Sequence, residues 1–109
     1  RSFRTRSDSS NPNFSSVKQG KTAIVMASCC LMMDRYEAAD RYLEKASQLS
    51  DDPLIGYIQL KVDLAQDGKN AHLLLKRLME HPSASFDLQM IALMLLVDRG
   101  RYMDVIQAR

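Results

Sequence analysis

Residues 34–53 read DRYEAADRYLEKASQLSDDP, and their pattern decides the fold. Apolar side chains recur at every third or fourth position, as they do on one face of an α-helix. They are Tyr36, Ala39, Leu43, Ala46 and Leu49, and charged residues fill the opposite face. Proline disfavours helix in the residue before it but fits the first turn of a new helix. The segment therefore predicts an amphipathic helix that ends before Pro53, where a second helix begins.

Alternation of helix and break continues along the rest of the chain. Helical spacing of apolar residues is found in residues 18–33, 54–66, 69–80, 84–97 and 102–109. Breaks within the helix pairs fall at Asp34, Gly68 and Gly100, separated by 34 and 32 residues. Such a period is typical of stacked helix-pair arrays. We therefore expect an all-α, right-handed α-solenoid of about three helical hairpins. The expected hairpins are residues 18–52, 53–82 and 83–109, the last of them truncated.

Length and composition agree with this class of fold. The chain has 109 residues, which allows one small domain and excludes a multidomain enzyme. Only 6% of the residues are aromatic while 46% are hydrophobic, a balance that favours packed helices over a sheet. Because the chain starts at Arg1 and its last helix stops at Arg109 without a capping signal, we expect a fragment of a longer array.

The beginning of the chain has a different composition. Residues 1–21 hold five basic residues and one acidic residue, together with six serines. We predict a flexible Ser/Arg-rich linker over residues 1–17, because so polar a segment buries little surface. Nucleic-acid binding by this segment is an alternative, but the cations lack the interleaved aromatic residues of a nucleic-acid arm. No apolar run reaches the roughly 20 residues of a membrane span, and no secretory signal is present. We therefore expect a nuclear or cytoplasmic protein without a membrane segment.

The segment quoted first resembles a known repeat family. Asp34-Arg35-Tyr36-Glu37-Ala38-Ala39, followed by Leu43, Ala46 and Pro53, is similar to the second half of a tetratricopeptide repeat (TPR). Gly100-Arg101-Tyr102 repeats the opening of this motif, whereas Leu73 stands where the family has an alanine near the turn. The resemblance extends over residues 18–109. It implies TPR-like repeats and a non-catalytic protein-protein interaction scaffold.

A narrower resemblance involves the start of the third hairpin. Residues 78–82 read LMEHP and lead into ASFDL at residues 84–88. This arrangement resembles divergent repeats of the meiotic TPR scaffold of the ZMM crossover-promoting group. The resemblance implies an interaction hub of meiotic chromosomes in the nucleus. Other divergent arrays, such as vesicle-coat, ciliary and proteolysis-complex scaffolds, share such motifs and remain alternatives.

Residues that could carry catalysis do not form a recognisable group in the sequence. Cys29 and Cys30 lie in the most apolar helix, where burial raises the pKa of a thiol and makes it inert. His72 and His81 lack zinc-ligand spacing with any cysteine pair. The four glycines are isolated, so no phosphate-binding loop is predicted. We expect no enzyme activity, no cofactor and no metal site.

A partner protein is the expected ligand, bound through an apolar helix or an extended segment. We predict apolar contact at four residues of the first helices of the hairpins, and charged contact at the rim. The apolar residues are Ile24, Ile58, Met90 and Met94, and the rim residues are Arg35 and Lys61. In the alternative, the chain is a structural spacer that stacks on neighbouring repeats of its parent protein. The helix with residues 88–97 supports that alternative, because it is apolar on most faces. An exposed apolar helix predicts self-association, which charged substitutions at Leu95 and Leu96 should abolish.

Overall fold

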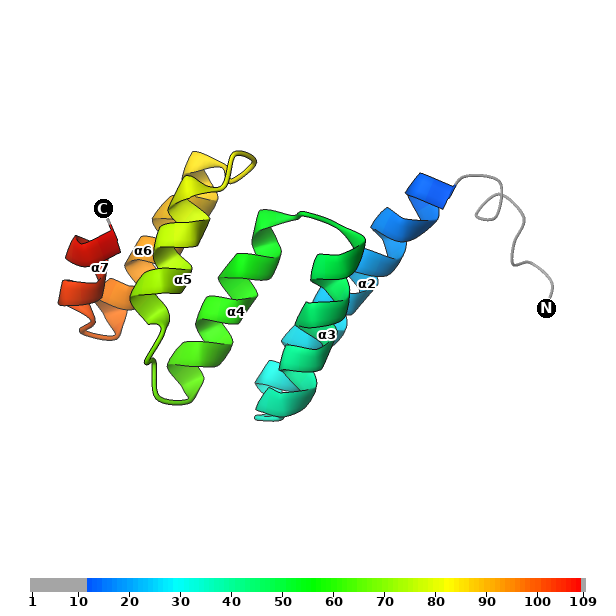
Figure 1. Ribbon diagram of the computed structural model, residues 1–109. Coiled ribbons are helices and arrows are strands. Elements are labelled where there is room, and N and C mark those ends of the chain that lie inside the picture. The colour runs from blue at the N-terminus through cyan, green and yellow to red at the C-terminus, as the bar shows by residue number, and fades with distance from the viewer. Residues whose placement is uncertain (1–11, 109) are drawn as a thin grey trace. The chain divides into compact units, whose positions relative to one another are not determined.

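The computed structural model describes residues 12–108, which form six helices and no strand (Figure 1). The helices are α2 (Pro12–Met32), α3 (Tyr36–Leu49), α4 (Pro53–Ala65), α5 (Ala71–Glu80), α6 (Phe86–Asp98) and α7 (Tyr102–Ala108). The all-α prediction is confirmed, and the solenoid stays a prediction. Within the described residues, no helix combines the length and apolarity needed to cross a membrane.

Helix α2 begins inside the predicted linker. The sequence placed residues 1–17 in that linker, but the structure is helical from Pro12 onward. Proline fits the first turn of a helix, where its missing N–H needs no partner. Residues 1–11 lie outside the described residues, so the prediction of a flexible segment there stays untested.

Two compact units divide the chain between Asp51 and Asp52, and each is described by itself. In the first unit, α2 pairs with α3. The interior of this pair is built largely from small residues, because alanine lets two helices approach closely. The buried hydrophobic residues are Ala23, Ile24, Ala27 and Cys30 of α2, and Ala39, Leu43 and Ala46 of α3. The division lies one residue from the expected boundary between the first two hairpins.

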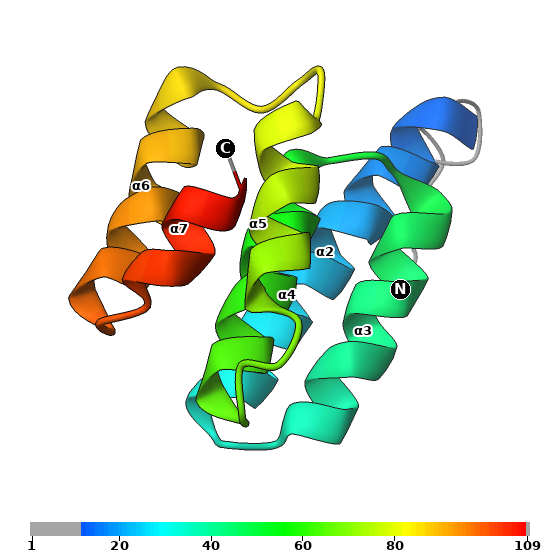
Figure 2. The same ribbon diagram turned by 60° about the vertical axis from the view of Figure 1, so that its left-hand side comes forward.

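The second unit has one apolar core formed by α4, α5, α6 and α7. Helix α5 packs against each of the other three, and Figure 2 shows it between α4 and α7. The buried members of this core are Leu60, Leu64, Ala71, Leu75, Leu78, Ala92, Leu96 and Ala108. Because α5 touches all three partners, its buried leucines join the helices of this unit.

The three predicted breaks coincide with the positive φ angles of the described residues. The φ angles are 61° at Asp34, 68° at Gly68 and 73° at Gly100. A residue of this left-handed conformation commonly ends a helix, and glycine adopts it without a steric penalty. The positions of the turns were therefore predicted correctly from the sequence.

The first and third turns share one hydrogen-bond pattern. After α2, the Arg35 N–H donates to the Cys30 carbonyl at 2.8 Å, and the Asp34 N–H donates to the Leu31 carbonyl at 3.0 Å. After α6, the corresponding bonds run from the Arg101 and Gly100 N–H groups at 2.9 and 3.0 Å. Both turns are Schellman motifs, in which these bonds satisfy the last carbonyls of the helix. The two turns, whose sequences are similar, therefore also have the same backbone hydrogen bonds.

Candidate protein-binding surface

Helix α6 exposes large apolar side chains along one side, which we call the α6 face. Its members are Phe86, Met90, Ile91 and Met94, and they are 40–71% exposed. The opposite side of the helix carries the buried Ala92 and Leu96. An exposed apolar group of this kind, with polar residues around it, marks an interaction site more often than scattered single residues do.

Two polar contacts near its N-terminal end hold α6 in place. At its start, the Ser85 hydroxyl accepts a 3.1 Å hydrogen bond from the Leu88 N–H, which is a helix cap. Gln89 Nε2 donates to the Met79 carbonyl near the end of α5 at 3.2 Å. The apolar face is thus carried by a fixed helix, which reduces the entropy lost when a partner binds.

Charged residues lie at both ends of α6. Asp87 and Asp98 are exposed, and so is Arg99, which directly follows the helix as its C-cap. The neighbouring helix α7 adds further exposed apolar side chains, namely Tyr102, Met103 and Ile106. A partner for this surface therefore needs apolar residues that cover these side chains.

The six residues predicted to bind a partner lie in different environments. Met90 and Met94 are exposed, one turn apart on the α6 face. Ile24 and Ile58 are only 4% and 6% exposed, so their side chains offer almost no surface to a partner in this structure. Helical spacing identified all of these residues as apolar positions, but spacing alone does not separate a core position from an apolar surface position.

The two rim residues are not part of the α6 face. Arg35 is exposed in the turn before α3, where its backbone closes the helix end. Lys61 is half-buried on α4, with its Nζ 5.4 Å from the centre of the Tyr57 ring, a cation–π geometry. Whether they contact a partner stays a prediction.

Charged substitutions at Leu95 and Leu96, which the sequence analysis chose as a test of self-association, would not act on an exposed surface. Leu96 is fully buried and Leu95 packs against the core of the second unit. Charges there would disrupt the core, so charged variants of this helix belong at Met90 and Met94 instead. The sequence does not distinguish the buried leucines from the exposed methionines, because the apolar run gives α6 apolar positions on every side.

A polar cluster that the sequence analysis missed attaches α7 to the turn between α4 and α5. Arg101 Nη2 donates to the Gly68 carbonyl at 2.6 Å, and Arg101 Nε donates to Asp104 Oδ2 at 2.7 Å. His72 Nδ1 lies 3.9 Å from Asp104 Oδ1. These contacts fix the helix that carries Tyr102, Met103 and Ile106. Helical periodicity gives no signal for the contact between Arg101 and Gly68, which are 33 residues apart. The only related signal in the sequence is that both residues lie at predicted turns.

Asp63 belongs to the edge of this cluster. Its Oδ2 accepts a 3.1 Å hydrogen bond from the Asn70 N–H. Burial raises the pKa of Asp63 above its ordinary value and Asp67 adds to the increase, while Asn70 and Arg101 act in the opposite direction. Among the described residues, no three His, Cys, Asp or Glu side chains are grouped as a metal ion would require.

We expect Asp63→Asn to stabilise the protein at pH 7. A carboxyl group with a raised pKa in the folded state contributes stability below its ordinary pKa of about 4, and that stability is lost as the pH rises through the raised value. Asparagine keeps an oxygen acceptor for the Asn70 N–H and does not ionise. Thermal unfolding at pH 3.5 and pH 7 checks this: the gain should be present at pH 7 and shrink at pH 3.5, and the reverse trend would contradict it.

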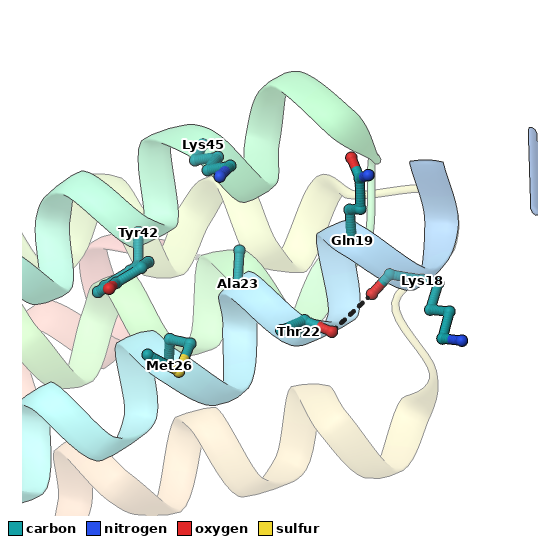
Figure 3. A pocket seen from close by; sticks show the side chains of 7 residues that line it. All are labelled: Lys18, Gln19, Thr22, Ala23, Met26, Tyr42 and Lys45. Atoms are coloured by element: carbon teal, nitrogen blue, oxygen red, sulfur yellow. Dashed lines mark hydrogen bonds between the residues drawn. The ribbon is translucent and has the colours of Figure 1, made fainter. Parts of the chain in front are cut away.

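The first unit contains a shallow pocket of about 330 Å³ between α2 and α3 (Figure 3). Its lining residues are Lys18, Gln19, Thr22, Ala23, Met26, Tyr42 and Lys45. The buried Ala23 lies between Gln19 and Met26 of α2, and Tyr42 and Lys45 extend from α3, whereas the Lys18 side chain points outward at one end. The pocket lining thus combines two lysines with the apolar Ala23 and Met26 and the ring of Tyr42.

Comparison with known proteins gives no match: no family model, no curated protein and no solved structure is similar to this chain. The TPR and ZMM resemblances of the sequence therefore stay predictions.

Proposed function

We propose that this protein is a non-catalytic protein-protein interaction scaffold that binds an apolar segment of a partner on the α6 face. The observation that carries this proposal is the exposure of Phe86, Met90, Ile91 and Met94 on one side of a capped helix. Methionine side chains adapt to differently shaped apolar partners, and this suits a scaffold.

Magnitudes are consistent with binding in the micromolar range. Full burial of one large apolar side chain contributes about 1.5–3 kcal/mol. Association and side-chain ordering cost about 4–15 kcal/mol, so several anchors on both partners are needed to reach the roughly 8 kcal/mol of micromolar affinity. The four side chains of the α6 face are 40–71% exposed, so each contributes only part of that amount, and α7 offers three more side chains.

The repeat family and the cellular setting are part of the proposal. TPR-like hairpins are supported by the shared Schellman turns at Asp34 and Gly100, which end the first helix of the first and third pairs. A role in a meiotic crossover complex in the nucleus rests on the LMEHP and ASFDL motifs alone, and a cytoplasmic scaffold is equally compatible.

A structural spacer is the second candidate function. It is favoured by the exposed apolar residues of α7, which together with the α6 face resemble a surface on which a further repeat stacks. Nucleic-acid binding would depend on the basic segment, most of which lies in residues 1–11, outside the described residues.

Peptide selection tests the proposed function. We expect a displayed library of helical peptides to yield binders with apolar residues three or four positions apart. Met94→Glu should lower their affinity at least tenfold, because a carboxylate would be buried at the contact. Leu73→Glu is the matched control, since Leu73 is an exposed leucine on α5, and it should leave the affinity unchanged. Binders that tolerate Met94→Glu would contradict the proposal.

A further inference from the structure

We infer that two copies of this chain dimerise by exchanging α7. In the exchange, the turn at Gly100 opens, α6 and α7 join in one straight helix, and the α7 of each copy binds the α7 seat of the other. The α7 seat is the surface of the second unit that α7 covers, with Gly68 and His72 as its polar members. The partner is thus a second copy of the chain, and this inference goes beyond the proposed function.

Helix α7 is held in its seat by few groups. It has seven residues, of which Ala108 is buried, and Val105 packs against the core while partly buried. Its polar contacts come from Arg101 and Asp104, which meet the two polar members of the seat. Release of α7 therefore breaks a small set of contacts. The seat of a second copy offers the same groups, so all of these contacts form again after the exchange.

An empty α7 seat would expose the core of the second unit. Helix α7 packs against α5 and α6, as Figure 2 shows. The core cluster that it completes includes Ala71, Leu75 and Leu96, all of them fully buried. Contact of such apolar side chains with water is unfavourable. The seat of an opened copy is therefore filled best by the α7 of a second copy, and exchange of an identical element is a low-cost route to a dimer.

The turn between α6 and α7 opens at a single residue. The two helices are separated only by residues 99–101. Gly100 has a left-handed φ of 73°, and a Cβ there would meet no atom within 4 Å. No packing around this residue therefore opposes a change of its backbone angles, and a few such residues are enough for a hinge. The chain has no proline between Phe86 and Ala108, so helical hydrogen bonds can continue through the turn.

The register of the straight helix explains why a second copy is needed. Residues spaced alternately by four and three positions lie on one side of a helix. Such a series runs through Met90, Met94, Val97, Arg101, Asp104 and Ala108. Its first two members belong to the α6 face, which points away from the buried side of α6, and its last three lie against the α7 seat. In the straight helix, the seat-facing side of α7 therefore points away from its own unit, and the seat of a second copy has to cover it.

Gly100→Ala tests the opening of the turn. A left-handed backbone disfavours alanine by a factor of about ten in each copy, whereas a straight helix favours alanine over glycine. We measure mass by light scattering against concentration, after refolding from urea. We expect a monomer–dimer equilibrium for the wild type and a dimer at least about 100-fold tighter for Gly100→Ala. Gly100→Asn is the matched control, because asparagine adds a Cβ but tolerates the left-handed conformation, and it should associate as weakly as the wild type.

A cross-link between two variants shows which seat α7 occupies. Both carry Gly100→Ala, Cys29→Ser and Cys30→Ala, and one adds His72→Cys while the other adds Asp104→Cys. His72 Nδ1 and Asp104 Oδ1 lie 3.9 Å apart. We expect a short bismaleimide to give a covalent dimer only when the two variants are refolded together. A dimer without exchange would leave each cysteine beside an unchanged residue of its own chain, and no covalent dimer would form.

Three results would overturn the inference. They are a wild type that stays monomeric up to about 1 mM, a Gly100→Ala variant that associates no more tightly than Gly100→Asn, and a refolded mixture without a covalent dimer. Circular dichroism establishes that the variants keep their helices, and if a cysteine variant loses them, the comparison of Gly100→Ala with Gly100→Asn decides alone.

The exchange and the proposed function fail in different ways. A monomeric chain that still selects peptides dependent on Met94 would overturn the exchange and leave the proposed function intact. An exchanged dimer of a chain whose selected peptides tolerate Met94→Glu would remove the proposed function and leave the exchange intact.

Discussion

Leu75→Ala is expected to lower the free energy of unfolding by about 2–5 kcal/mol, because it opens a cavity in the middle of the second unit. Leu75 is completely buried on α5, the helix that packs against α4, α6 and α7. Small domains have a total stability of about 5–15 kcal/mol, so this single change would remove a large part of it.

Leu73→Ala is the control for this prediction. Leu73 lies on the same helix and is 52% exposed, so its truncation should change the free energy of unfolding by less than about 1 kcal/mol. Urea unfolding followed by circular dichroism measures both variants. Similar losses for the two leucines would contradict the assignment of α5 as the centre of the core.

Gly68→Ala is expected to be the most damaging substitution in the turns of this chain. Its φ of 68° is left-handed, which costs a residue with a Cβ about 1–2 kcal/mol. A Cβ at this position would also overlap the Arg101 guanidinium, which must then leave the Gly68 carbonyl. Losing a hydrogen bond from a charged group adds about 1.5–3 kcal/mol. We expect α7 to detach from α5 in this variant.

Gly100→Ala separates these two effects. Its φ of 73° is nearly the same, but a Cβ there would meet no atom within 4 Å. Gly100→Ala should therefore lose only the stability that a left-handed φ costs a residue with a Cβ. In an Arg101→Met background, the excess loss at Gly68 should disappear. Equal losses at the two glycines in the wild-type background would show that the Arg101 contact contributes nothing.

The sequence predicted helices and turns correctly where they depend on the spacing and type of neighbouring residues. The spacing of apolar residues predicted α3 over residues 36–49, and the structure has it at Tyr36–Leu49. The beginning of α5 was predicted two residues too early, at Lys69. There the Asp67 carboxylate accepts from the Lys69 N–H and Asp63 accepts from the Asn70 N–H. These side-chain bonds extend the turn, and propensity alone does not reveal them.

The residues of the proposed binding surface were predictable only in part. Met90 and Met94 were named from their register in the repeat, and both are exposed, but the same register also named the buried Ile24 and Ile58. Burial depends on which sides of a helix its neighbours cover, and α6 has apolar residues on every side. The pocket between α2 and α3 was not predicted, because it arises from side chains of two helices around the small Ala23.

Methionine methyl signals in a nuclear magnetic resonance spectrum test the central claim most directly. The chain has seven methionines, and Met90 and Met94 lie on the α6 face, whereas Met79 packs against the core. Titration with a selected apolar helical peptide should shift the Met90 and Met94 signals and leave the Met79 signal in place. Unchanged Met90 and Met94 signals at saturating peptide would show that α6 is not the binding surface.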